Sequence, residues 1–168
     1  MLSNFDIDEL VKKMEIKNFQ GCFYKDKLKE IKSNSSYILN LNSEFDENGN
    51  RNKGSHWVAL CIDDDKQAIY FDSYGLESPK EIKNLLKCNQ YKIGNTTKNI
   101  QSLMSNLCGY FCLGFIYFLN VSNFRTKVYV YSLSARSWTA SSASRRTPAA
   151  PSPNVGLTAL QVRVLEGA

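Results

Sequence analysis

The sequence predicts a single α+β domain, and three observations support this fold class. Residues 54–75 contain two segments that alternate apolar with polar or small residues, separated by aspartates at 63–65, which is the pattern of a β-hairpin. Two stretches fit the capping box that opens a helix. Residues 108–119 are apolar nearly all round, as expected of a buried helix. With 168 residues and 43% apolar content, the chain is long enough to bury one core.

The hairpin places the only histidine of the chain opposite a carboxylate. A turn centred on Asp64 predicts three cross-strand pairs: Leu60 with Ala68, Val58 with Tyr70, and His56 with Asp72. Directly opposed residues on one face hold their Cβ atoms roughly 4.5–5.5 Å apart. A carboxylate at that distance can fix the imidazole tautomer and stabilise its charged form. The pattern therefore predicts a general base at the open end of the hairpin.

Before the hairpin we expect a helix, a connector, a strand and a long loop. Asp6 and Glu9 fit a capping box for a helix that extends to about residue 15, with an apolar side formed by Ile7, Leu10, Val11 and Met14. Residues 19–28 are interpreted as a packed connector, and residues 36–41 as a strand. Residues 42–55 are polar, and a loop of this length is either functional or mobile. Because it leads into His56, we interpret it as a rim of the site.

After the hairpin, Ser78 and Glu81 fit a second capping box, with proline at the first helical position, for a helix that extends to about residue 87. Residues 91–93 and 96–100 are predicted to be short extended segments that lead to Gln101.

The buried helix begins near Cys108, with Ser105 or Asn106 as candidates for its cap. Cys108 would then lie in the first turn, where unpaired backbone N–H groups and the helix dipole favour a thiolate. Gly109 and Gly114 lower the intrinsic helix propensity but would let a neighbouring backbone come close.

Composition divides the chain at about residue 124. Residues 1–124 hold fifteen Asn and two Ala, whereas residues 125–168 hold one Asn and seven Ala, with Ser, Arg and Pro. We therefore predict a domain at 1–124, truncated at its C-terminal end, and a poorly ordered tail at 125–168 of different coding origin, such as a frameshift or a fusion. The alternative is a natural linker with a short terminal strand at about 160–165.

The net charge of +5 comes entirely from this tail, because residues 1–124 balance fifteen basic against fifteen acidic residues. The neutral main domain therefore gives no support for a nucleic-acid partner. No run of 18 apolar residues is present, so we expect no membrane span and no membrane partner. We expect a monomer.

Cysteine usage favours a reducing compartment. The five cysteines form no CxxC pair and are odd in number, so a disulfide framework is not expected. One histidine and no close cysteine pair also give no zinc site, and no cofactor is predicted. The acidic N-terminus is unlike a signal peptide. We expect an intracellular location and not a secreted protein.

Four residues supply the groups that acyl transfer by a thiol requires. Cys108 is the candidate nucleophile, His56 the base that activates it, and Asp72 the acceptor that orients the imidazole. Gln101 has an amide NH2 suited to a developing oxyanion, beside the backbone N–H of Cys108. Taken singly, a lone histidine or a buried cysteine is more often structural. Their joint placement predicts a catalytic site.

The segments Gly54-Ser-His-Trp, Tyr70-Phe-Asp-Ser-Tyr-Gly and Cys108-Gly, together with Gln101 and the segment at 19–26, resemble the adenovirus proteinase (adenain) family. That family is part of a wider group of cysteine proteases that includes the SUMO-specific proteases. The motifs are most similar to those of virophage, large DNA virus and Maverick/Polinton-type proteases. The resemblance covers roughly residues 7–120.

The resemblance implies a papain-like or adenain-like fold, with a mostly antiparallel sheet and the nucleophile at the N-terminus of a buried helix. It implies Cys108 as nucleophile, His56 as base, Asp72 as its orienter, Gln101 as oxyanion donor and Trp57 packed on the histidine. From the resemblance we expect a cysteine endopeptidase that cleaves Gly-containing sites in viral or mobile-element precursor proteins, with a role in virion maturation. The resemblance also implies that the intracellular location is the host cytoplasm, the nucleus or a virion. The alternatives are a deconjugating isopeptidase for a ubiquitin-like or SUMO conjugate, and an inactive truncated remnant.

Overall fold

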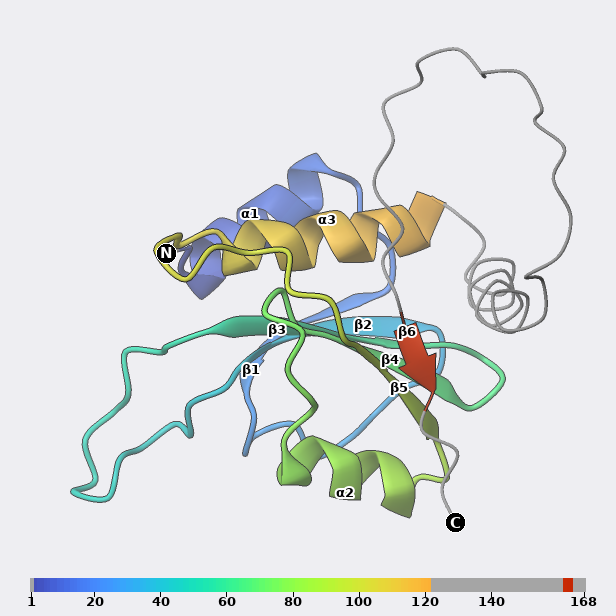
Figure 1. The fold of residues 1–168 in the computed structure, drawn as a ribbon, viewed down its shortest axis with the longest axis horizontal. Coiled ribbons are helices and arrows are strands. Elements are labelled where there is room, and N and C mark those ends of the chain that lie inside the picture. Colours follow the sequence, from blue (N-terminus) through green and yellow to red (C-terminus); the bar gives the residue numbers. More distant parts are fainter. Residues whose placement is uncertain (1, 122–161, 165–168) are drawn as a thin grey trace, which may run out of the picture.

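The computed structural model describes residues 2–121 and, by their backbone, residues 162–164, which form an α+β domain (Figure 1). Its helices are α1 (Asn4–Lys13), α2 (Lys80–Cys88) and α3 (Cys108–Val121). Its strands are β1 (Phe19–Tyr24), β2 (Ser35–Asn40), β3 (Trp57–Ile62), β4 (Gln67–Phe71), β5 (Lys92–Thr96) and β6 (Val162–Val164).

The strands form one twisted sheet in the order β1-β2-β3-β4-β5-β6. The pairs β1·β2 and β4·β5 are parallel, and the pairs β2·β3, β3·β4 and β5·β6 are antiparallel. The sheet is therefore mixed: three of its five strand pairs are antiparallel and two are parallel, whereas the resemblance implied a mostly antiparallel sheet. Helices α1 and α3 lie on one face, and α2 crosses the other face between β4 and β5 (Figure 1).

The two central strands are buried on both faces. Along β3, Ala59 and Cys61 join the core beneath α1 and α3, while Val58 and Leu60 join the core above α2. All six residues of β3 are buried, because alternate side chains of a strand enter opposite cores. Helix α3 packs directly on β3, so the strand that follows His56 is fixed from both sides.

The predicted hairpin exists, but its register is wrong by two residues. Leu60 pairs with Tyr70 and Ile62 with Ala68, whereas a turn at Asp64 would pair Leu60 with Ala68. The cause is a longer turn: the Asp63 carboxylate accepts from the N–H groups of Asp65 and Gln67, and Lys66 takes a left-handed φ of 60°. A shift of two residues keeps every side chain on its face, whereas a shift of one would reverse all of them.

Of the two predicted capping boxes, the first is displaced and the second is absent. Helix α1 begins three residues earlier than expected: Ser3 is its N-cap, and the side chain of Asp6 accepts from the Ser3 N–H at 2.8 Å while the Asp6 N–H donates back at 3.2 Å. Pro79 is the N-cap of α2, and its side chain has no group that could form a capping hydrogen bond. The hydroxyl of Ser78, the predicted cap, is buried without a partner, and the Ser78 N–H donates to Asn95 at 3.1 Å.

Two strand assignments also change. Residues 19–24, expected to be a connector, form the edge strand β1, whose half-buried residues lack a clear alternation. The two extended segments expected at 91–93 and 96–100 are replaced by the single strand β5. The strand expected at 36–41 is confirmed as β2, and the segment 42–55 is a loop, with one bridge between Phe45 and Arg51.

Strand β6 lies inside the range of the alternative terminal strand expected at 160–165 and pairs with β5. The rest of the predicted tail lies outside the described residues. Within the described part of the chain, no helix has the length and apolar character needed to span a membrane.

Candidate active site

His56, Asp72 and Cys108 come together from three different elements. His56 immediately precedes β3, Asp72 immediately follows β4, and Cys108 is the first residue of α3. The Nε2 atom of His56 lies 2.8 Å from Oδ1 of Asp72. In the observed register these two residues are diagonal rather than directly opposed, and the long imidazole side chain spans the difference.

The carboxylate of Asp72 is fully buried and held from several sides. Its Oδ1 also accepts from the backbone N–H of Tyr74 at 2.8 Å, and the Asp72 N–H donates to the hydroxyl of Thr96 at 3.0 Å. Its Oδ2 is buried without a hydrogen-bond partner. An acceptor held this way fixes the orientation of the imidazole. One face of the imidazole also stacks on the ring of Tyr74, with the ring centroids 4.7 Å apart.

The Cys108 thiol lies beside the imidazole of His56, close enough for each group to act on the pKa of the other. Since Asp72 engages Nε2, Nδ1 is the ring nitrogen that remains available to the sulfur. Burial alone would raise the pKa of the Cys108 thiol, but the hydrogen bond and positive charge of His56, with backbone hydrogen bonds from Trp57 and Gly109, lower it below its ordinary value of 9.0. The start of a helix favours the thiolate further.

The imidazole shows the matching shift. Burial lowers the pKa of His56, but hydrogen bonds with Asp72 and Cys108 and their negative charges outweigh it and raise this pKa from 6.5 to about 9. A lowered thiol pKa beside a raised imidazole pKa is the signature of a thiolate–imidazolium pair. Asp72 and Cys108 thus both stabilise the positive charge of one imidazolium ring.

Gln101 lies next to this group but its amide is already bonded. Its Oε1 accepts from the Ser73 hydroxyl at 2.6 Å, and its Nε2 donates to the Ser105 carbonyl at 2.8 Å and to the Tyr74 hydroxyl at 3.3 Å. The longer bond, to Tyr74, is the one that an oxyanion would replace most readily. The carbonyl of Ser105 thus accepts a hydrogen bond from Gln101. The hydroxyl of Ser105, which was predicted to cap the helix, is buried without a hydrogen-bond partner.

Sequence reasoning missed Ser73, Tyr74 and Thr96 as parts of the site. Ser73 is fully buried, and its carbonyl also accepts from the N–H groups of Ile100 and Gln101, so it anchors the segment that carries the amide. Ser73 and Tyr74 follow Asp72 directly in the sequence, and this position next to a predicted site residue could have indicated that they belong to the site. Thr96 gave no such signal, because it lies 24 residues from Asp72.

Trp57 connects the site to the N-terminal segment. Its indole N–H donates to the Leu2 carbonyl at 2.8 Å, and its own carbonyl accepts from the Cys112 thiol at 3.3 Å. Leu2 also packs on the start of α3, where a Cβ added to Gly109 would lie 3.0 Å from Leu2 Cδ1. Both glycines of α3 were expected to let a neighbouring backbone come close. At Gly109 the close neighbour is instead the side chain of Leu2, and a Cβ added to Gly114 would have no neighbour within 4 Å.

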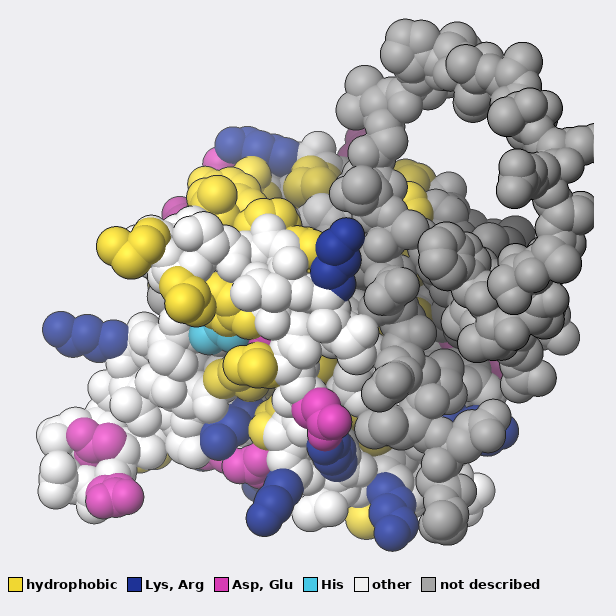
Figure 2. All heavy atoms as spheres, in the orientation of Figure 1, with side chains coloured by type: hydrophobic (Ala, Val, Ile, Leu, Met, Phe, Trp, Pro, Cys, Tyr) yellow, Lys and Arg dark blue, Asp and Glu magenta, His cyan; other side chains and the backbone are white. Residues whose placement is uncertain are grey.

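The histidine side chain is 12% exposed and lies at the surface among hydrophobic side chains (Figure 2). Leu107, directly before Cys108, is half-exposed, and Leu103 and Met104 are largely exposed. All five cysteines are free thiols. Among the described residues, no cluster of three or more His, Cys, Asp or Glu side chains could hold a metal ion.

No family model and no curated protein matches this sequence. Among solved structures, the chain is similar to the ASFV pS273R protease, with a TM-score of 0.47 and 21% identity over 74% of this chain and 60% of that one. A selenomethionine form of the same protease gives a TM-score of 0.45 and 20% identity over 73% and 62%. The chain thus spans about 60% of the length of these proteins. Similarity at this level does not decide an activity, which has to be inferred from the residues of the site.

Proposed function

We propose that this protein is a cysteine endopeptidase with Cys108 as nucleophile, His56 as general base and acid, Asp72 as the orienting acceptor and Gln101 as an oxyanion donor. The observation that carries the proposal is the shared imidazole. One nitrogen of His56 is bound to a buried carboxylate at 2.8 Å, while the same ring lowers the pKa of a thiol at a helix start. A structural cysteine would show the opposite shift, as burial raises the pKa of Cys112 well above 9.0.

The proposed reaction follows from this geometry. The Cys108 thiolate attacks the carbonyl carbon of a peptide bond, and the resulting oxyanion accepts hydrogen bonds from the Cys108 N–H and the Gln101 amide. The imidazolium of His56 then gives its proton to the departing amine, which leaves a thioester on Cys108. Water, deprotonated by the neutral imidazole, attacks the thioester and releases the carboxylate product, which regenerates the thiolate and the imidazolium.

The finer assignments are proposals of the same kind. A papain-like or adenain-like fold, a preference for glycine before the cut, and precursor proteins of a virus or mobile element as substrates are supported by the motif resemblance alone. The substrate class follows from the chemistry: the site fits a polypeptide and uses no cofactor in the steps above.

The test is labelling with a peptide probe that ends in Gly-Gly and carries a thiol-reactive group. We expect one equivalent of label on Cys108 and none on Cys108→Ala, and labelling slowed at least about 100-fold in His56→Ala. Cys88 is an exposed thiol outside the site, so Cys88→Ala is the matched control and should label normally.

Equal labelling of the unmodified chain and His56→Ala would contradict the proposal, because reactivity would then not depend on the imidazole. Failure of the folded chain to react at all would favour the inactive remnant. A second substrate, a ubiquitin-like domain fused through Gly-Gly to a reporter, distinguishes the two activities. A deconjugating isopeptidase should cleave this fusion much faster than a short Gly-Gly peptide, whereas an endopeptidase should cleave the short peptide equally well.

A further inference from the structure

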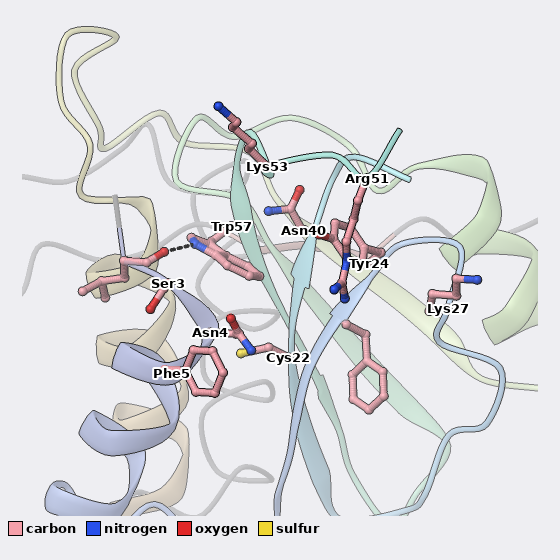
Figure 3. A pocket seen from close by; sticks show the side chains of 12 residues that line it. Ser3, Asn4, Phe5, Cys22, Tyr24, Lys27, Asn40, Arg51, Lys53 and Trp57 are labelled. Atoms are coloured by element: carbon pink, nitrogen blue, oxygen red, sulfur yellow. Dashed lines mark hydrogen bonds between the residues drawn. The ribbon is translucent and has the colours of Figure 1, made fainter. Parts of the chain in front are cut away.

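A pocket of about 610 Å³ is lined by Trp57, the residue that follows His56 in the chain (Figure 3). It is formed by the N-terminal end of α1, strand β1, and the loop that leads into His56. The described residues that line it are Leu2, Ser3, Asn4, Phe5, Cys22, Phe23, Tyr24, Lys27, Asn40, Arg51, Lys53 and Trp57. None of them is acidic.

Two lining residues join the pocket to the proposed nucleophile. Trp57 follows His56 in the chain, and its carbonyl accepts from the thiol of Cys112, which lies about one turn after Cys108 in α3. Leu2 accepts the indole N–H of Trp57 and packs against Gly109, the residue after Cys108. An extended polypeptide with its scissile bond at Cys108 would therefore reach this pocket within a few residues, since each residue of an extended chain spans about 3.3 Å.

The pocket is two-sided. Trp57 and Phe5 provide an aromatic side next to α1, while Arg51, Lys27 and Lys53 come from the opposite side and the rim (Figure 3). The Arg51 guanidinium points in among the other lining side chains, while the amines of Lys27 and Lys53 lie at the rim and point outward (Figure 3). Apolar walls with a few polar groups are typical of ligand pockets. A suitable ligand would therefore be a segment of polypeptide that carries one negatively charged side chain and apolar groups beside that charge.

The positive charges are only partly compensated. Glu44, outside the lining, pairs with Lys27 at 2.8 Å and reaches Arg51 at 3.5 Å, and Asp26 adds a second negative charge near Lys27. Arg51 is 70% exposed, so its single long contact with Glu44 leaves most of its donors available. Lys53 is exposed and has no ion pair among the described residues. An added carboxylate would thus meet Arg51 and Lys53 rather than a neutralised site.

We propose that this pocket is a specificity subsite that recognises an acidic side chain of the polypeptide substrate, a few residues away from the bond that is cut. The inference rests on the proposed peptidase function for its direction, because the chain that fills the pocket is the one that reaches Cys108. Arg51 supplies a planar fork for the carboxylate and Lys53 a mobile positive charge, while Trp57 and Phe5 pack on the neighbouring residues.

Binding to the Cys108→Ala full chain tests the subsite without any need for catalysis. The probes are fluorescein-labelled peptides with a Gly-Gly centre in which a single Glu, Gln or Lys is moved through every position on both sides. We expect a Glu peptide at one position to bind about fivefold tighter than its Gln counterpart, with a preference that shrinks as salt is raised.

The charge-reversed variant Lys53→Glu, in the same background, should abolish this preference and favour the Lys peptide instead. Lys80→Glu is the matched control: it reverses an exposed lysine on α2, on the opposite face of the sheet, and should keep the preference for Glu. Equal affinity for Glu and Gln peptides at every position, including no measurable binding of either, overturns the subsite.

The unmodified chain separates the two proposals. If Cys108 labels as described above but cleavage is indifferent to the charge of the substrate, the peptidase stands and the subsite fails. If the preference for Glu appears in binding while Cys108 proves unreactive, the pocket binds acidic peptides and the peptidase fails. When both hold, kcat/KM should follow the order of the binding constants.

Discussion

At the scale of single residues, the site is defined by one imidazole whose positive charge is stabilised by two neighbouring groups, Asp72 and Cys108. The acid is buried and the imidazole nearly so, and each charge is compensated by its neighbour rather than by water. This compensation moves the pKa of His56 up and that of Cys108 down, so the two groups are charged together over a window of pH. A pH profile is therefore the most direct measure of the pair.

The first prediction concerns this window. The folded pKa of His56, about 9, is above its ordinary value of 6.5, so the stabilisation that protonation provides is complete below about pH 6.5 and is lost as the pH rises through about 9. The lowered pKa of Cys108 sets the acid limit, below its ordinary value of 9.0. At pH 7 we expect iodoacetamide to alkylate Cys108 faster than Cys88, and kcat/KM to fall above about pH 9.

Asp72→Asn provides the contrast. It removes the charge that raises the pKa of His56, so the alkaline limb should move to lower pH, and kcat/KM should fall about 100-fold or more because the tautomer is no longer fixed. Asp64→Asn, an exposed carboxylate in the hairpin loop, is the control that should change neither. An unchanged alkaline limb in Asp72→Asn would show that the carboxylate does not act on the imidazole.

The second prediction separates two roles of Gln101. If its amide N–H stabilises the oxyanion, Gln101→Ala should lower kcat about 100-fold with little change in KM, since the contact is made only in the transition state. Ser73→Ala removes the partner of Oε1 but keeps the amide donor, so it should lose far less. Equal losses in both variants, with lower melting temperatures, would assign Gln101 a structural role only.

At the scale of elements, local sequence signals located helices and strands better than they located their ends. A capping box was expected at residue 6 and lies at residue 3, because Ser3 and Asp6 satisfy the same pattern as Asp6 and Glu9. The hairpin was found, but its register depended on a turn that the Asp63 carboxylate organises over residues 63–67. His56 and Asp72 still meet, because an error of two residues in register preserves the face of the strand.

The third prediction uses the two glycines of α3 as a matched pair. Gly114 is exposed and an added Cβ meets nothing within 4 Å, so Gly114→Ala should stabilise the fold by about 0.5–1 kcal/mol through helix propensity. At Gly109 the same gain is opposed by contact with Leu2 at 3.0 Å. Urea unfolding of both variants measures the difference, and a larger gain at Gly109 than at Gly114 would show that Leu2 yields freely.

At the scale of the whole molecule, the sheet brings together groups that are far apart in sequence. His56 and Asp72 are joined by one hairpin, which a sequence pattern can reveal, and Cys108 could be placed by its helix start. Thr96 and Leu2 support the site from β5 and from the N-terminus, and no local pattern predicts such contacts. The parallel pairs β1·β2 and β4·β5 were missed for the same reason, since parallel pairing depends on crossover connections rather than on adjacent strands.

The last prediction concerns the boundary proposed at residue 124. The described core residues of both sheet faces lie between Ile7 and Leu119, and β6 adds only three paired residues to the edge of β5. A chain ending at residue 124 should therefore still unfold in one cooperative transition. Its free energy of unfolding should be lower than that of the full chain by less than about 2 kcal/mol, because only a few edge hydrogen bonds at about 0.5–1.5 kcal/mol each are lost and water replaces part of them. Its Cys108 should react with the peptide probe at the rate of the full chain. A broad transition or an unreactive Cys108 would mean that residues beyond 124 complete the domain, because the edge of β5 would then need its partner to hold Thr96 against Asp72.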